Sequence, residues 1–261
     1  MFQAKLKNLA HVLGAIAIAY FTLSCPAASA APIIPSSLSP GAKYHLIFIT
    51  SDLGLGDFGN GPGTFGTIPY GNLGGIGNAN IIVNTAANVS TALTMGANYR
   101  AIISDSTTSA IGLSTFLNGG NSPIYNTQGQ LVSPNYASMF QGIATALNNP
   151  IRYTEYGVSA TFGAWTGTDS NGIHKFSRSN WTGASTLGTR GVPNQTAAPW
   201  IDSGTNNLNQ ALRLYGISEE LTVPVPEPGT ISLIALGVVL GGHTLRRRRQ
   251  PGANADFCAT A

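Results

Sequence analysis

The residues best suited to bind a ligand lie in one short polar loop. Asp169-Ser170-Asn171-Gly172 follows Trp165 closely and precedes Trp181. Carboxylate and amide oxygens are ligands that calcium prefers, and polar groups beside aromatic rings are also typical of small-molecule sites. The same four residues fit an Asx turn closed by Gly172, which stays open as an alternative. The predicted ligand loop therefore comprises Trp165, Asp169, Asn171 and Trp181.

A second pair of carboxylates, Asp52 and Asp57, lies in a glycine-rich stretch. Paired carboxylates can hold calcium or act as acid and base in hydrolysis. The alternating Asp and Asn pattern of a calcium loop is absent here, so turn capping is the favoured role for both.

Metal and nucleophile chemistry has few candidates between residues 31 and 226. This range holds two histidines, His45 and His174, and no cysteine. We expect His45 to be a hydrogen-bonded strand residue and His174 to be exposed in a loop. Zinc sites draw on Cys and His, so we predict no metal and no cofactor. No G-x-S-x-G motif marks a serine nucleophile, and we predict no catalytic residue, although a Ser-His-Asp arrangement stays open.

The elements that must position these residues indicate an α+β domain of roughly 190 residues. The apolar run Tyr44–Thr50 predicts a buried strand, and Asn78–Met95 has small apolar residues at helical spacing. We further predict strands at 99–104 and 212–218, a short helix at 136–147 and a long loop at 54–77, which is rich in glycine.

Composition and charge exclude nucleic acid as a partner. The pI is near 9.0, but charged residues make up only 9% of the chain. Basic residues concentrate at the two ends, and residues 31–226 carry seven basic and eight acidic side chains without a cluster. A phosphate backbone needs a basic stripe, which this range lacks.

The N-terminal end, residues 1–30, has the pattern of a signal peptide. Lys5 and Lys7 precede an apolar run from Leu9 to Leu23, and small residues follow at Ala28-Ser29-Ala30. This order predicts export through the Sec translocon and cleavage between Ala30 and Ala31.

The C-terminal end combines three features over residues 223–249. Pro226-Glu227-Pro228 cannot continue a helix, residues 230–245 are apolar, and Arg246, Arg247, Arg248 and Arg249 follow. At roughly 1.5 Å per residue the apolar stretch is about 24 Å long if helical, which predicts one short transmembrane helix. Residues 250–261 would then form a cytoplasmic tail.

This tripartite pattern resembles the PEP-CTERM sorting signal. The resemblance implies recognition by exosortase in the inner membrane of a Gram-negative bacterium, and cleavage near Pro226–Pro228. The tail at 250–261 departs from the pattern, because members of that family usually end soon after the arginines.

Residues 78–222 resemble bacterial surface domains related to endostatin and the C-type-lectin-like fold. The matching segments are Tyr99–Asp105, Ser122–Asn126 with Gly129, Ala164–Gly172, Trp181–Gly183, Trp200 and Leu214–Ile217. The resemblance implies that the tryptophans and the terminal Leu-Tyr strand are core, and that long loops carry any binding. Related domains usually contain disulfides, and this one has no cysteine.

We therefore expect a membrane-anchored precursor at the inner membrane, whose mature form carries the exported α+β domain, residues 31–222, and lies at the cell surface or in the extracellular matrix. Its expected role is non-catalytic, structural or adhesive, with contact to exopolysaccharide through Trp165, Trp181 and the polar loops. Two alternatives stay open. One is a secreted hydrolase of matrix polysaccharide, and the other is an uncleaved single-pass surface protein.

Overall fold

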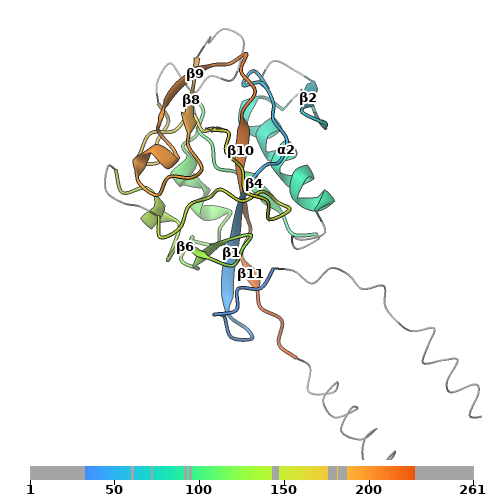
Figure 1. Ribbon diagram of the computed structural model, residues 1–261, viewed down its shortest axis with the longest axis vertical. Helices are drawn as coiled ribbons and strands as arrows, with labels where there is room; N and C mark the ends of the chain where they lie inside the picture. Colours follow the sequence, from blue (N-terminus) through green and yellow to red (C-terminus); the bar gives the residue numbers. More distant parts are fainter. Residues whose placement is uncertain are drawn as a thin grey trace, which may run out of the picture. The chain divides into compact units, whose positions relative to one another are not determined.

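A computed structural model of the protein describes residues 33–226, with gaps at 60–61, 72, 91–92, 94–95, 143–146, 176–180 and 182–186 (Figure 1). The chain divides into two compact units. The described part of the first comprises residues 33–38 and 43–221, and that of the second residues 39–42 and 222–226. The predicted signal peptide, transmembrane stretch and cytoplasmic tail lie outside the described residues.

The described residues form a mixed structure with a large sheet and few helices. The strands are β1 (Lys43–Ile49), β2 (Gly63–Phe65), β3 (Ile68–Tyr70), β4 (Tyr99–Ala101), β5 (Ile124–Asn126), β6 (Leu131–Ser133), β7 (Ala164–Trp165), β8 (Leu187–Gly191), β9 (Gly204–Asn207), β10 (Arg213–Ser218) and β11 (Leu221–Thr222). The helices are α2 (Gly75–Val89) and three 3₁₀ helices, η1 (Ala110–Thr115), η2 (Ala137–Met139) and η3 (Ala198–Trp200).

Strands β1 and β10 lie at the centre of a sheet that has nine strands within the described chain. They pair antiparallel, with Ile47 opposite Ile217. β5 pairs parallel with the other edge of β1, while β4 and β7 both pair with β10. The predicted strands at 44–50, 99–104 and 212–218 are thus confirmed as neighbours, although β4 covers only the first half of its predicted range.

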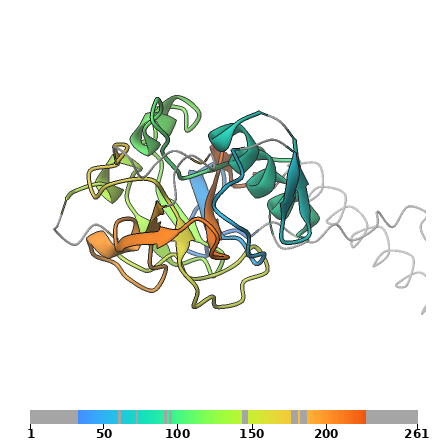
Figure 2. The ribbon, with the colours of Figure 1, turned by 90° about the horizontal axis from the view of Figure 1, so that it is seen from above.

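Both faces of the central strands are covered, which explains why β1 reads as a continuous apolar run rather than an alternating one. Ile47, Ile49, Tyr215 and Ile217 belong to one core cluster, together with Trp200. On the opposite face, Phe48 packs edge-on against Tyr99 with ring centroids 5.9 Å apart. Figure 2 shows α2 on one side of β1 and β10.

Helix α2 packs directly against Gly216 of β10. A Cβ atom at Gly216 would lie 2.5 Å from Val83 Cγ1 and 2.6 Å from the Phe48 ring, so only glycine allows this approach. The buried face of α2 carries Ala79, Ile82, Val83, Ala86 and Ala87, which recur at the spacing of a helix. The predicted helix at 78–95 is confirmed, but it begins at Gly75 and ends at Val89.

The predicted loop at 54–77 is wrong in part, because β2 and β3 form a hairpin within it. Its glycines serve close packing instead of flexibility. A Cβ atom at Gly54 would lie 2.2 Å from the Phe65 ring, and one at Gly56 would lie 2.9 Å from Trp165. The predicted helix at 136–147 is reduced to η2 among the described residues, and Phe140 after it turns inward onto Trp200.

The second unit is described over residues 39–42 and 222–226. Gly41 N–H donates to the Val223 carbonyl, and Val223 N–H donates to the Ala42 carbonyl, each at 2.9 Å. Across the described chain, no helix is both long and apolar enough to cross a bilayer.

Candidate functional site

Three asparagines on one face of α2 form hydrogen bonds to the chain segment that leads into and forms β4. Asn80, Asn84 and Asn88 are spaced four residues apart, so they lie on one face of the helix. The Oδ1 atoms of Asn80 and Asn84 accept from the Ala101 and Tyr99 N–H groups, each at 2.9 Å. Asn88 Oδ1 accepts from Gly96 N–H at 3.1 Å. Asn80 and Asn84 thus satisfy main-chain donors on the edge of β4 that does not pair with β10, and Asn88 satisfies one in the segment before β4.

The same contacts orient the side-chain amides. A main-chain N–H can only donate, so the oxygen of each amide must face it and the NH₂ group must point away. The Nδ2 atoms of Asn80 and Asn84 have no hydrogen-bond acceptor within the described part of the chain. Two donors are therefore held in a fixed direction and remain available to a ligand.

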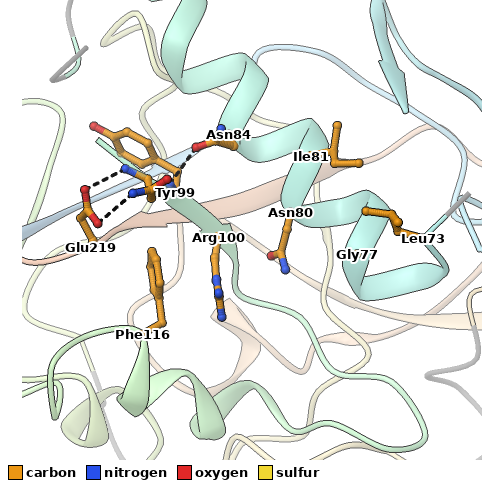
Figure 3. A pocket seen from close by; sticks show the side chains of 10 residues that line it. Leu73, Gly77, Asn80, Ile81, Asn84, Tyr99, Arg100, Phe116 and Glu219 are labelled. Atoms are coloured by element: carbon orange, nitrogen blue, oxygen red, sulfur yellow. Dashed lines mark hydrogen bonds between the residues drawn. The ribbon is translucent and has the colours of Figure 1, made fainter. Parts of the chain in front are cut away.

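These donors line a pocket of about 610 Å³, which we call the α2 pocket, between α2, β4 and the end of η1 (Figure 3). Its walls combine amides, one cation, one carboxylate and apolar side chains: Leu73, Gly77, Asn80, Ile81, Asn84, Asn98, Tyr99, Arg100, Phe116 and Glu219. The volume falls within the range of about 300–1,000 Å³ that is usual for small-molecule sites.

Arg100 provides the positive charge of the pocket. Its guanidinium carbon lies 4.6 Å from the centre of the Phe116 ring, which follows η1. In Figure 3 the Arg100 side chain runs between Phe116 and Asn80. Stacking on an aromatic face restrains a guanidinium while leaving its N–H groups free to donate.

Glu219 provides the negative charge, directly after β10. Its Oε1 accepts from Asn98 N–H and its Oε2 accepts from Asn98 Nδ2, each at 3.0 Å. This carboxylate is held by an amide and not by Arg100. Both pocket charges therefore remain available to a polar ligand.

The predicted ligand loop splits into an exposed part and a buried part. Asp169 and Asn171 lie in a surface turn, where Asp169 Oδ1 accepts from the Asn171 and Ile173 N–H groups at 2.9 and 3.0 Å. Gly172 closes the turn with φ of +82° and donates its N–H to the Asp169 carbonyl. This is the Asx turn that the sequence left open.

The two tryptophans of that loop are core residues. Trp165 is 0% exposed and Trp181 is 2% exposed. Their rings meet edge-on at 5.9 Å, and Trp181 stacks on Phe58 at 5.1 Å. The indole N–H groups donate to the carbonyls of Gly54 and Ser104. Neither ring has a face open to a ligand, which revises the expectation that they contact polysaccharide.

Asp52 is a turn-capping residue, as its sequence context favours. Its Oδ2 accepts from Thr67 N–H and Thr67 Oγ1, at 3.1 and 2.6 Å, across the turn of the β2–β3 hairpin. No group of three His, Cys, Asp or Glu side chains within the described ranges could hold a metal ion.

A buried carboxylate that sequence reasoning missed is Glu155. It is 1% exposed and accepts hydrogen bonds from the Ser51 N–H and hydroxyl groups. Burial raises its pKa, and these hydrogen bonds oppose the rise. Nearby, burial lowers the pKa of Arg213, whose guanidinium donates to the Thr50 and Ser51 carbonyls. These contacts tie together the end of β1 and the start of β10.

His45 is a buried strand residue, as expected. Its Nδ1 lies 3.1 Å from the Ser218 carbonyl and donates to it, and burial lowers the pKa of the imidazole. His174 lies in a loop and is half-buried, with Nδ1 3.5 Å from Ser109 Oγ. The two histidines therefore occupy separate places, one in β1 and one beyond the Asp169 turn.

Of the predicted sorting-signal residues, the described chain includes only Pro226, which is exposed. Glu227, Pro228 and Arg246 to Arg249 lie outside the described residues, as do Ala28, Ala30 and Ala31 of the predicted signal-peptide cleavage site.

Residues 224–249 match the family described as the PEP-CTERM protein-sorting motif. The match agrees with the sorting signal predicted at 223–249. Proteins with this motif are exported and anchored in the membrane before processing, and the motif implies exosortase as the processing partner. A search of curated proteins finds no match to the chain.

Sequence reasoning did not identify the residues of the α2 pocket. One signal was present: asparagines at positions 80, 84 and 88 of a helix whose other face is apolar. Asparagine is unfavourable within helices, so its repetition on one face indicates a specific use for the side chains.

Proposed function

We propose that this protein is processed by exosortase and then acts, without catalysis, as a structural or adhesive component of the cell surface or extracellular matrix that binds polysaccharide. The sorting motif at 224–249 carries the proposal, because it begins two residues after β11 ends. Its position leaves the first unit free to act outside the cell once the anchor is removed.

The α2 pocket supports binding as the role of that unit. Polysaccharides present hydroxyl groups at close intervals, and a site for them needs fixed hydrogen-bond donors and acceptors beside apolar surface. Asn80 and Asn84 offer donors, Glu219 offers acceptors, and Ile81 and Phe116 offer apolar walls.

We also propose a C-type-lectin-like fold for this unit. The mixed architecture and the burial of Trp165, Trp181, Trp200 and Tyr215 support it. The resemblance covers residues 78–222, but β1, which precedes that range, lies at the centre of the sheet. The folded domain must therefore include the chain from Lys43 onward.

Mass spectrometry of the mature protein tests the processing. We expect an N-terminus at Ala31 and a C-terminus near Pro226–Pro228, with residues 250–261 absent. Replacing Pro226 and Pro228 by alanine should leave the full C-terminus in place, whereas Pro40→Ala, an exposed proline outside the motif, serves as the control. An intact Ala261 in the wild-type surface fraction would instead support the uncleaved single-pass anchor.

A glycan array probed with the full-length protein, purified in detergent, tests the role. Saturable binding without turnover supports an adhesive function. Release of shortened saccharides would support the alternative of a secreted hydrolase.

A further inference from the structure

We infer that the α2 pocket selects an acidic saccharide, in which Arg100 holds the carboxylate of a hexuronic acid residue and the Asn80 and Asn84 amides hold its hydroxyls. The inference rests on the proposed polysaccharide binding and names the class of sugar. The carboxylate, the hydroxyls and the ring of such a residue each have a counterpart in the pocket.

The carboxylate has its counterpart in Arg100. Within the described part of the chain, its guanidinium forms no hydrogen bond and no ion pair, and it stacks on the Phe116 ring. Both lysines of the described residues, by contrast, form ion pairs. Lys43 pairs with Glu220, and Lys175 pairs with Asp202. A stacked guanidinium with free N–H groups matches the planar, bidentate geometry of a carboxylate.

The hydroxyls have their counterparts in the amides and in Glu219. A sugar hydroxyl both donates and accepts, so it needs donors and acceptors around it. The Nδ2 atoms of Asn80 and Asn84 donate, and their direction is fixed by the β4 N–H groups behind them. Each Glu219 oxygen has one hydrogen bond from Asn98 and retains a lone pair for a hydroxyl.

The charges also set the orientation of the ligand. Asn98 holds Glu219 in place, so no internal ion pair competes with the ligand for Arg100. Repulsion from Glu219 and attraction to Arg100 act together on a ligand carboxylate and direct it to Arg100. The apolar walls formed by Leu73 and Ile81 then face the C–H groups of the sugar ring.

Calorimetric titration of the full-length protein in detergent tests this inference. The probes are digalacturonic acid and digalactose, its carboxyl-reduced counterpart. We expect the acidic disaccharide to bind at least about tenfold more tightly, the effect of one charge-assisted hydrogen-bonded contact. Added salt should weaken the acidic disaccharide more than the neutral one.

Arg100→Gln should abolish the difference between the two probes, and Arg100→Lys should retain part of it. Arg152→Gln is the matched control, because the Arg152 guanidinium also stacks on a ring, that of Tyr153 at 5.1 Å, but lies outside the pocket. Unchanged thermal unfolding of each variant shows that the fold is intact.

Three results would overturn the inference. Equal affinity for both probes would remove the acidic selectivity, and equal loss in the Arg152→Gln control would remove the role of Arg100. Binding of neither probe by a protein that still binds polysaccharide on the array would place the binding elsewhere. In all three cases the proposed function would stand, whereas a protein that binds no glycan at all would overturn both.

Discussion

Two polar regions of the first unit, the Asp169 turn and the α2 pocket, contain the same kinds of groups but use them differently. In the turn, both Asp169 oxygens accept hydrogen bonds from the turn itself, including Oδ2 from Asn171 Nδ2 at 3.4 Å. In the pocket, main-chain N–H groups occupy only the oxygens of Asn80 and Asn84, and the NH₂ groups and the Arg100 guanidinium remain free. The first arrangement closes a loop, and the second presents donors to a ligand.

This difference shows how a structural polar cluster can be distinguished from a binding one. Polar side chains that satisfy each other and their own backbone contribute to folding. A side-chain amide whose oxygen is held by a main-chain N–H group and whose NH₂ group has no partner is pre-organised to bind a ligand. Three substitutions test the distinction, and a fourth, at the Lys43–Glu220 ion pair outside both regions, gives a reference for a paired charge. They follow from the largest expected effect to the smallest.

Gly216→Val should have the largest effect, because it should disrupt the α2 pocket. The new side chain would overlap Val83 of α2 and the Phe48 ring, and would push α2 away from the sheet. We expect a loss of about 3 kcal/mol in the free energy of unfolding, measured by urea denaturation, and loss of saccharide binding. Gly112→Val, where a Cβ atom meets nothing within 4 Å, should cost less than about 0.5 kcal/mol. Equal losses would show that α2 does not depend on Gly216.

Asn84→Leu should remove the acceptor for Tyr99 N–H. Leaving a buried donor unpaired costs about 2 kcal/mol in unfolding free energy. The control is Asn88→Leu, because Asn88 lies on the same face of α2 but accepts from the exposed Gly96 N–H. We expect a loss of under about 1 kcal/mol there. A larger effect at Asn88 would mean that the helix face, and not the edge of β4, governs stability.

Asp169→Ala should affect the turn alone. The Asn171 and Ile173 N–H groups would lose their acceptor. Because the turn is exposed, we expect the free energy of unfolding to fall by only about 1 kcal/mol. Thermal unfolding of the wild type should not respond to calcium or to a chelator, since the turn already occupies the carboxylate. If calcium raised the unfolding temperature of the wild type but not that of Asp169→Ala, the hypothesis of a calcium site in this loop would be supported instead.

Glu220→Gln should have the smallest effect and a clear pH dependence. Although burial raises the pKa of Glu220, hydrogen bonds from Lys43, Ser122 and Asn118 and the Lys43 charge lower it to about 2. A lowered pKa in the folded state stabilises the protein above pH 4.5, and this contribution is lost as pH falls toward 2. The difference between wild type and variant should be under about 1 kcal/mol at neutral pH, because Lys43 is exposed. A difference that stays constant down to pH 2 would contradict the ion pair.

Sequence patterns identified the main elements wherever local composition and tertiary packing agree. β1 and β10 are apolar and β-branched or aromatic, and α2 repeats small apolar residues at helical spacing, so they were found with errors of a few residues. The β2–β3 hairpin is not predicted from the sequence, because Pro69 and several glycines are unfavourable in strands. Glycines in such number predict a loop from local pattern alone, whereas several of them allow rings such as Phe65 and Trp165 to pack closely.

The sequence by itself determined the C-terminal sorting signal, because a proline pair, an apolar run and an arginine cluster act through their order along the chain. The Asx turn at Asp169 could also be predicted from the sequence, since its contacts span only a few residues. The resemblance implied that the tryptophans are core, and only the tertiary structure decided that neither Trp165 nor Trp181 keeps a face open to a ligand. It also decided that Asn80 and Asn84 meet Arg100 and Phe116 in one pocket. Helix packing, strand pairing and η1 bring these residues together across long sequence separations, which local patterns do not encode.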